Sequence, residues 1–150
     1  MRISAKSEYA ILAILDLAKD YDNDNVRTID EIANGESVPQ KFLVQILLEL
    51  KRAGIVESKR GVGGGYRLAR NPRDITLGEI IRLIDGPILP FKCDSPTNEY
   101  YDNTCVHNNN CIMKPIWVDV RKAIETILDD VSFEELLSKR TNKNAPMYHI

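Results

Sequence analysis

The chain has 150 residues, 43% of them hydrophobic, and its 20 basic and 22 acidic side chains leave a formal net charge of −2. This length allows one substantial core but excludes two large independent domains, and the balanced charge excludes a protein coated with positive charge for unspecific nucleic-acid binding. The chain shows neither an apolar signal region at its start nor a run of about 18 apolar residues, so we expect a cytoplasmic protein without a membrane partner.

An amphipathic helix is predicted over residues 5–20, where apolar side chains recur on one stripe. A shorter helix is predicted at about 29–34, because Thr28 and Glu31 have the spacing of a capping box. We expect Gly35 to end it, since glycine tolerates the left-handed conformation that often closes a helix. The helix at 29–34 is therefore expected to be followed, after a tight connection, by the helix-forming segment that begins at Pro39.

Residues 39–53 are predicted to form the recognition helix of a helix-turn-helix unit. Pro39 suits the first turn of a helix, and apolar residues then recur at three- and four-residue spacing. Because the connection from the preceding helix is tight, the pair has the arrangement in which the second helix enters the major groove. The residues near its start that could contact bases or phosphates are Pro39, Gln40, Lys41 and Gln45.

Residues 60–66, with the sequence RGVGGGY, predict the tip of a β-hairpin, because glycine permits tight turns and close backbone approach. The surrounding residues 51–73 carry seven basic side chains and one acidic one, a confined face that suits phosphate contact. A solvated charged hairpin is the alternative. After a recognition helix, such a hairpin is typical of a winged helix-turn-helix, with Arg60 entering the minor groove. The further DNA-contact candidates are Arg2, Ser4, Lys6, Lys51, Lys59, Gly63, Gly64, Tyr66 and Arg67.

Two helices are predicted after the hairpin. Thr76 and Glu79 repeat the capping-box spacing and begin a helix that Gly86 and Pro87 end. Residues 112–131 then carry a wide apolar stripe, more than a helix beside a small domain needs to bury. Since two-fold DNA sites require two-fold proteins, we expect this stripe to form a homodimer interface. The alternative is that it packs within its own chain.

Together these patterns predict a mainly α protein with a small β-hairpin, in which a winged helix-turn-helix is followed by a long C-terminal dimerisation helix. We expect a DNA-binding domain, a cysteine-bearing sensor loop, a dimerisation helix and a C-terminal tail at residues 1–85, 86–111, 112–131 and 132–150. An enzyme is not expected, because the chain has two histidines, no nucleophile motif and no phosphate-binding glycine signature ahead of a helix.

All the cysteines of the chain, Cys93, Cys105 and Cys111, lie in one irregular segment without apolar periodicity. An odd number of cysteines in the cytoplasm argues against a disulfide framework. Thiolates are soft ligands that suit zinc, copper(I) and iron-sulfur clusters, and the residues alone do not select among these. The nearest candidates for a fourth ligand are His107, Asp94 and Asp102.

The sequence resembles the Rrf2 family of bacterial regulators over nearly its whole length. The motifs that carry the resemblance are the MRISAKSEYA start, the PQKFL beginning of the recognition helix, the RGVGGGY wing, the ITLGEII helix, and a cysteine triplet before a helix with Trp117. The triplet resembles the iron-sulfur branch of the family. The resemblance implies a dimeric repressor that binds a double-stranded DNA operator. Its cysteines would hold a cluster, 2Fe-2S in preference to 4Fe-4S, that senses cluster, iron, redox or nitric oxide status.

The resemblance also bears on the fourth ligand and on an alternative function. Lys114 stands where some members carry a histidine ligand, and a protonated lysine cannot coordinate a metal. Glu8 matches an acid that other members supply from the partner subunit, which implies Glu8 as the fourth ligand. The alternative reading of Glu8 is an acid favoured by the helix dipole. A cluster-free member senses cysteine supply through a metabolic enzyme, so a repressor gated by such a partner or by thiol redox is the alternative function.

Overall fold

The computed structural model describes residues 3–23, 25–88 and 111–143. Over these residues the chain is mostly helical with one antiparallel two-stranded hairpin, which confirms the predicted class. The α-helices are α1 (Ala5–Ala18), α2 (Ile29–Glu36), α3 (Gln40–Arg52), α4 (Leu77–Asp85), α5 (Lys114–Asp130) and α6 (Phe133–Lys143). The strands are β1 (Val56–Lys59) and β2 (Gly65–Leu68), and the short 3-10 helices are η1 (Tyr21–Asn23) and η2 (Pro72–Asp74).

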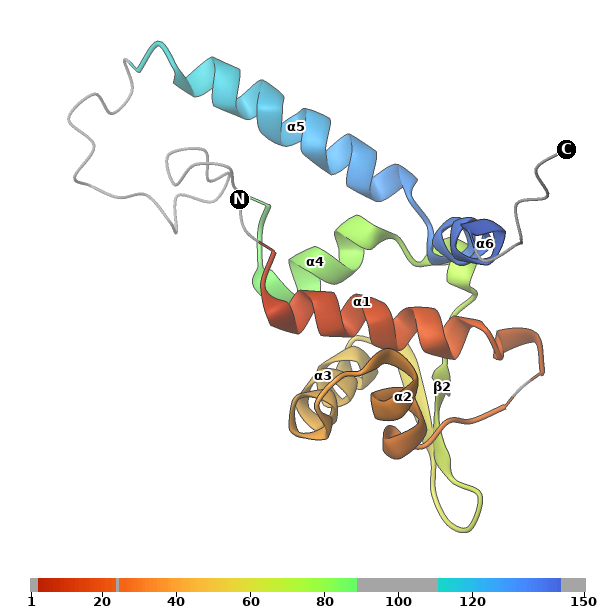
Figure 1. The fold of residues 1–150 in the computed structure, drawn as a ribbon. Coiled ribbons are helices and arrows are strands. Elements are labelled where there is room, and N and C mark those ends of the chain that lie inside the picture. Colours follow the sequence, from red (N-terminus) through yellow and green to blue (C-terminus); the bar gives the residue numbers. More distant parts are fainter. Residues whose placement is uncertain (1–2, 24, 89–110, 144–150) are drawn as a thin grey trace, which may run out of the picture.

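Helix α1 runs through the middle of the molecule (Figure 1) and contacts α2, α3, α4, α6 and β2. In Figure 1, α2, α3 and the hairpin lie below α1, whereas α4, α5 and α6 lie above it. The apolar stripes of these elements meet in one core, whose largest fully buried side chains include Phe133, Ile14, Ile32, Leu43, Ile46 and Leu47. The hairpin tip and α5 consequently lie at opposite ends of the molecule.

The turn between α2 and α3 differs from the prediction by two residues. Helix α2 continues through Gly35, and Ser37 takes the left-handed conformation with φ of 54°. The prediction that α2 ends at Gly35 is wrong. The helix ends instead at the left-handed Ser37, and this position of the turn places the next side chain, Val38, in the core, where it is 3% exposed. Pro39 has extended backbone angles and is the N-cap of α3, one position before the helix that it was expected to begin.

Both predicted N-terminal caps form, although only one is reciprocal. At α2 the Thr28 hydroxyl accepts from the Glu31 backbone N–H, and the Thr28 backbone N–H donates to the Glu31 carboxylate at 2.7 Å. At α4 the Thr76 hydroxyl accepts from the backbone N–H of Glu79 at 3.2 Å. The carboxylate of Glu79 instead accepts from Arg70 at 2.6 Å. Spacing alone therefore located both helix starts.

Helix α6 is anchored in the core of the winged-helix unit. The Leu77 backbone N–H donates to Val131 at 2.9 Å, and the Phe133 N–H donates to Ile75 at 3.0 Å. The Phe133 ring is fully buried. From the sequence we assigned residues 132–150 to a C-terminal tail, so a helix of this length and its buried ring were not predicted. No helix in the described part of the chain is long and apolar enough to cross a membrane.

Ion pairs attach α6 to the end of α2. The Glu36 carboxylate, 4% exposed, accepts from Arg140 of α6 at 2.9 Å and from Lys19 at 3.0 Å. Lys19 also donates to the buried carboxylate of Asp16 at 2.7 Å. Burial disfavours the charge of Glu36, but the hydrogen bonds from Arg140 and Lys19 outweigh it and hold the pKa of its carboxyl below the ordinary value. The position of α6 on α2 is thus electrostatically fixed.

Candidate nucleic-acid interface

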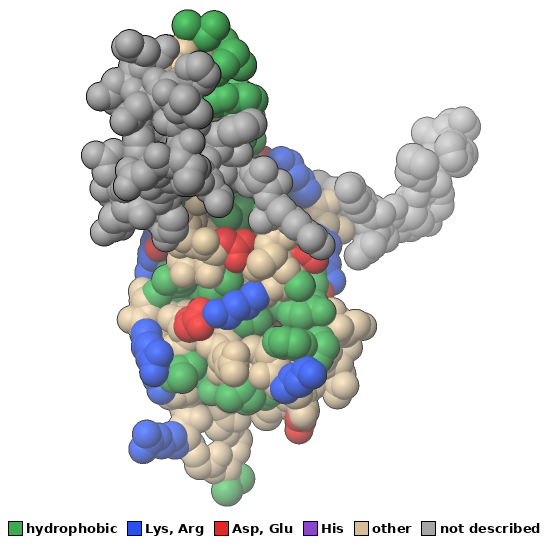
Figure 2. Space-filling model, turned by 90° about the vertical axis from the view of Figure 1, so that its left-hand side faces the viewer, with side chains coloured by type: hydrophobic (Ala, Val, Ile, Leu, Met, Phe, Trp, Pro, Cys, Tyr) green, Lys and Arg blue, Asp and Glu red, His purple; other side chains and the backbone are tan. Residues whose placement is uncertain are grey.

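Helix α3 has one face in the core and one on the surface. The side chains that fill the core are Leu43, Ile46, Leu47 and Leu50, each fully buried. The opposite face is exposed, and along it surface residues recur at intervals of four, three and four, at Lys41, Gln45, Leu48 and Arg52, with Val44 beside them. Figure 2 views the molecule from the side on which α3 lies and shows apolar patches between basic side chains, with the hairpin projecting below. The geometry leaves this face of α3 open to a partner.

The predicted base-reading residues lie at the exposed start of α3. The Gln40 amide donates to the Asp30 carboxylate of α2, so it is oriented by the preceding helix. The Lys41 ammonium lies 5.0 Å from the centroid of the Phe42 ring, an arrangement favoured by cation–π attraction. The Gln45 side chain is exposed and forms no hydrogen bond with the described residues. Its amide is therefore free to pair with a base edge.

Lys6 and Lys51, both predicted as DNA contacts, bind acceptors within the chain. Lys6 of α1 donates to both carboxylate oxygens of Glu49 on α3, at 2.7 and 2.8 Å. Lys51 donates to the hydroxyl of Ser58 on β1 at 2.5 Å. The first contact neutralises an acid on the recognition helix, and the second joins the end of that helix to the hairpin. Both cations can approach DNA while they hold α3 in position.

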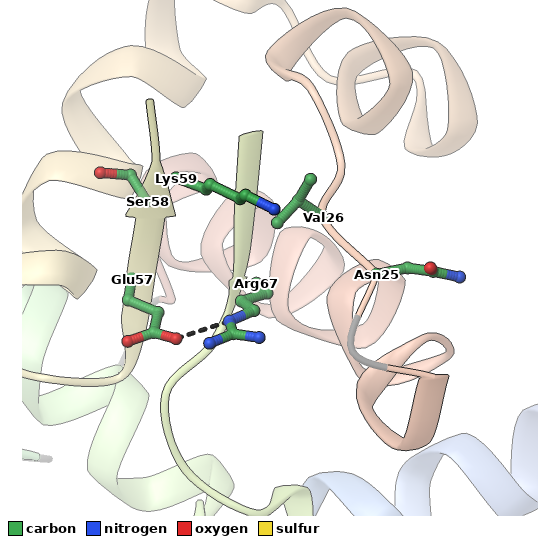
Figure 3. A pocket seen from close by; sticks show the side chains of 6 residues that line it. All are labelled: Asn25, Val26, Glu57, Ser58, Lys59 and Arg67. Carbon is green, nitrogen blue, oxygen red and sulfur yellow. Dashed lines mark hydrogen bonds and ion pairs between the residues drawn. The ribbon is translucent and has the colours of Figure 1, made fainter. Parts of the chain in front are cut away.

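The hairpin presents a mixture of paired and unpaired charges. Strand pairing places Glu57 opposite Arg67, and the Arg67 guanidinium donates to the carboxylate at 2.5 Å. Of the charged wing residues that the structure describes, Lys59 and Arg60 form no ion pair. Figure 3 shows Lys59 extending toward Val26 across an open pocket of about 530 Å³. The residues that line it are Asn25, Val26, Glu57, Ser58, Lys59 and Arg67.

Glycines shape the tip of the wing as the sequence indicated. Gly63 has φ of 73°, which a residue with a side chain rarely adopts. The turn is closed by a hydrogen bond of 2.9 Å from the Gly64 N–H to the carbonyl of Gly61. Val62, between them, is fully exposed. The tip thus offers backbone and one apolar side chain to whatever it meets.

The base of the wing is fixed by a short pairing with the segment before α2. Arg27 and Tyr66 exchange backbone hydrogen bonds of 2.8 and 2.7 Å, so this segment extends the hairpin by one bridge. A Cβ on Gly65 would lie 2.5 Å from the Arg27 carbonyl oxygen, so the pairing requires glycine there. Arg27 is itself held by Asp20 at 2.6 Å. Tyr66, predicted as a DNA contact, is half-buried, and its backbone joins the wing to this segment.

The start of α1 is tied to the end of α4. Ser4 is the N-cap of α1, and its hydroxyl and backbone N–H donate to the Asp85 carboxylate at 2.5 and 2.9 Å. Desolvation disfavours the charge of Asp85, but these two hydrogen bonds outweigh it and lower the pKa of its carboxyl. Glu8, one turn into α1, is exposed. Ser4 thus has a structural role in addition to the predicted phosphate contact.

Of the predicted metal ligands, only Glu8 and Cys111 lie within the described residues. Cys111 is partly exposed and lies just before α5, and its carbonyl accepts from the Lys114 N–H at 3.2 Å. Within 3–23, 25–88 and 111–143, no group of three or more His, Cys, Asp or Glu side chains could hold a metal ion. The predicted site residues outside these ranges are Cys93, Cys105, Asp94, Asp102, His107 and Arg2.

Several residues of this surface were absent from the predicted DNA contacts, among them Glu49 and Leu48. Glu49 was not identified as the partner of Lys6. The signal was its charge, because a carboxylate on a DNA-facing helix would repel phosphates unless a neighbouring cation neutralised it. Leu48, 46% exposed, was not singled out. The signal was available, because Leu48 is an apolar residue on the polar side of the helical period.

Comparison with known proteins gives a consistent result. The Rrf2 family, described as iron-dependent transcriptional regulators, matches residues 3–139. The putative transcriptional regulator rrf2-like of Rhodobacter capsulatus is 36% identical over 138 residues, which cover 91% of this chain and 92% of that protein. Among solved structures, T. potens IscR matches with a TM-score of 0.76 and 32% identity over 99% of this chain and 97% of that one. CymR, called the global cysteine regulator of B. subtilis, matches with a TM-score of 0.72 and 30% identity over 93% of this chain and 98% of that one.

Proposed function

This chain belongs to the Rrf2 family of transcriptional regulators, and from that premise we propose that it is a homodimeric repressor that binds a double-stranded DNA operator and senses its signal through a cluster held by its three cysteines. Membership also establishes the winged helix-turn-helix fold and the role of a transcription regulator rather than an enzyme. Because its target is DNA, we place the protein in the cytoplasm.

The observation that carries DNA binding is that α3 and the hairpin lie on the same side of α1 (Figure 1). Helix α3 has an exposed face, and Lys59 and Arg60 of the hairpin form no ion pair with the described residues. Helix α3 would enter the major groove, where the Gln45 amide can pair with adenine. Arg60 would enter the adjacent minor groove, and Lys59 would contact phosphate. The pairing of Lys6 with Glu49 supports this orientation, since it removes an acid that would repel the DNA backbone.

The DNA-binding proposal is tested by replacing Arg60 with Ala. We expect a loss of about 1–3 kcal/mol in binding free energy to a duplex selected from a randomised pool. The matched control is Arg73→Ala, because Arg73 is an exposed arginine of η2, the element that contacts α6. Equal losses in both variants would contradict groove reading, and a change confined to the salt dependence would reduce Arg60 to a phosphate contact.

Dimerisation is supported by the open side of α5. No residue of α5 is buried, and Ile116 and Ile127 are 52% and 65% exposed. Ile112 and Met113, just before the helix, are also exposed. In Figure 1, α5 extends beyond the elements beneath it. A second copy of α5 would cover this apolar side and place two α3 helices on one operator.

The cysteines fit an iron-sulfur cluster by the chemistry of their donors. Cys93, Cys105 and Cys111 would supply three thiolates, and Glu8 of the partner subunit the fourth ligand. When bound, the cluster would supply an iron centre that reacts with oxygen or nitric oxide and that is lost when iron is scarce. Cys111 adjoins α5, so the described end of this segment is attached directly to the helix that we propose as the dimer interface.

The cluster proposal is tested by the visible spectrum and by the iron and sulfide content of protein purified without oxygen. We expect coloured protein with stoichiometric iron and sulfide, and colourless protein in the Cys111→Ser variant. Glu8→Ala should alter the spectrum, whereas Glu134→Ala, which removes an exposed acid on α6, should not. An unchanged spectrum and stability in Glu8→Ala would exclude Glu8 as a ligand.

A second function is favoured by the similarity to CymR, which matches nearly as well as IscR. In that case the chain is a cluster-free repressor gated by a metabolic enzyme or by thiol redox. Colourless protein that binds its operator with full affinity would support it. Operator binding that changes with thiol oxidation would then separate redox control from gating by a partner.

A further inference from the structure

We propose that Val44 and Leu48 of α3 are specificity-determining residues that contact the C5-methyl groups of two nearby thymines in the operator. The inference rests on the proposed function, because it requires α3 to lie in the major groove. It adds recognition of thymine, through its methyl group, to the adenine, guanine and phosphate contacts expected of the polar residues predicted from the sequence.

The two side chains lie together on the open side of α3. Val44 is 51% exposed and Leu48 is 46% exposed. They are four residues apart, so they are neighbours on the helix surface. Leu43 and Leu47, the residues directly before them, are fully buried. In each of these two adjacent pairs, α3 therefore directs the first side chain into the core and the second to the surface. The outward pair thus lies on a helix whose inner face is fully packed into the core.

The chemistry of the surroundings indicates nucleic acid as the occupant. Lys41 lies before the apolar pair and Lys51 and Arg52 lie after it, and all three are exposed. Figure 2 shows apolar side chains between basic ones on this side of the molecule. Cations at both ends complement a polyanion, whereas Val44 and Leu48 cannot bind phosphate. The one apolar group that the major groove presents is the thymine methyl.

The spacing of the pair limits which thymines it can reach. Side chains at positions i and i+4 of a helix are about 5–6 Å apart, and successive base pairs of B-DNA rise by about 3.4 Å. Val44 and Leu48 would therefore contact methyl groups one or two base pairs apart. We accordingly expect each half-site to contain two thymines at that separation.

The test removes the methyl groups from DNA without changing base pairing. A duplex is selected from a randomised pool with the full-length wild-type protein, and each thymine is then replaced in turn by deoxyuridine. At two positions per half-site the wild type should bind about three- to fivefold more weakly, the effect of losing one buried methyl group. Val44→Ala should lose this dependence at one position and Leu48→Ala at the other.

Phe42→Ala is the matched control. Phe42 is another exposed apolar residue of α3, 41% exposed, but its ring packs 5.8 Å from that of Tyr9. This variant should keep the wild-type dependence on both methyl groups. Thermal unfolding of all three variants checks that they fold, and exposed side chains should leave the midpoint nearly unchanged.

The outcomes separate this inference from the function on which it rests. Selection of no specific duplex by the wild type would overturn both. Specific binding that no deoxyuridine substitution weakens would overturn the inference alone. The inference alone is also overturned if Val44→Ala and Leu48→Ala keep the full dependence on the thymine methyl groups. Val44 and Leu48 would then be assigned to contact with a protein partner.

Discussion

Helices α3 and α5 are both amphipathic, yet the chain completes the packing of only one of them. The four apolar side chains on the inner face of α3 are fully buried. Helix α5 is longer, 17 residues against 13, but none of its residues is buried, and Ile127 remains 65% exposed. Burial of apolar surface is the main favourable contribution to folding, and within its own chain α3 obtains much more of it than α5 does.

The difference distinguishes packing that is complete within one chain from packing that we propose is completed by a second chain. Helix α3 is positioned by its own chain, so its outer face is available for DNA. Helix α5 has an apolar side that calls for a second surface, which we propose is another α5. Changes in the core of α3 should therefore act at any protein concentration, whereas changes on α5 should act through association.

The largest effect is expected from Leu47→Ala in the core of α3. It should lower the free energy of unfolding by about 2–5 kcal/mol, because it leaves a cavity in a fully packed site. Leu48→Ala, one residue further on and exposed, should change it by no more than about 0.5 kcal/mol. Urea unfolding at two protein concentrations measures both, and a similar loss in the two variants would contradict the assigned faces of α3.

Next in size is the effect of placing charges on α5. Ile116→Glu combined with Ile127→Glu should weaken the dimer by more than about 2 kcal/mol, because the dimer would have to bury two unpaired carboxylates from each chain. The control is Thr126→Glu, an exposed polar position about 100° around α5 from Ile127, which should leave association nearly unchanged. Sedimentation velocity over a concentration series measures the shift. If the double variant remains as associated as the wild type, α5 is not the interface.

A smaller effect should appear in the acid stability of the α2–α6 contact. The folded-state pKa of Glu36 lies below its unfolded value of about 4.5, so its contribution is complete above that pH and is lost as pH falls through the folded-state pKa. Glu36→Gln should therefore cost about 1–3 kcal/mol at pH 7 and progressively less in acid. Unfolding midpoints from pH 7 down to strongly acidic conditions measure the difference. Glu134→Gln, an exposed acid of α6, is the control, and a Glu36→Gln effect that does not change with pH would exclude the ion pairs as its cause.

The smallest effect concerns the charge balance on α3. Lys6→Ala should weaken operator binding by about 1 kcal/mol, because it leaves the Glu49 carboxylate uncompensated near the DNA. Adding Glu49→Gln should restore most of the affinity if neutralisation is the role of Lys6. If the second change restores nothing, Lys6 binds phosphate directly, as its sequence position first indicated. Fluorescence anisotropy at two salt concentrations distinguishes these roles.

Local patterns in the sequence located most of the winged-helix unit. Capping spacing placed the starts of α2 and α4, helical periodicity placed α1, α3 and α5, and the glycine run placed the wing. These signals are local because each depends on residues within a few positions of one another. The end of α2 was misplaced, since the burial of Val38 overrides the preference of Gly35 for a turn.

Contacts between distant segments could not be read in this way. Phe133 gives little periodicity within a polar run, yet it fills the core, because the chain returns to Ile75 after α5. The pair formed by Lys6 and Glu49 joins residues separated by 43 positions. Cys111 and Glu8 lie within the described residues, but the complete ligand set does not, so it stays a prediction.

The central claim is that two chains join through α5 and present two α3 helices to one operator. Its most direct test is sedimentation equilibrium of the protein with a labelled, selected duplex, for the wild type and for the variant with Ile116→Glu and Ile127→Glu. We predict two chains per duplex for the wild type at every degree of saturation. For the variant we predict weaker binding by single chains, so that complexes with one chain per duplex appear before the second half-site fills. A wild-type complex with a single chain, or a variant that binds as a pair with full affinity, would contradict the claim.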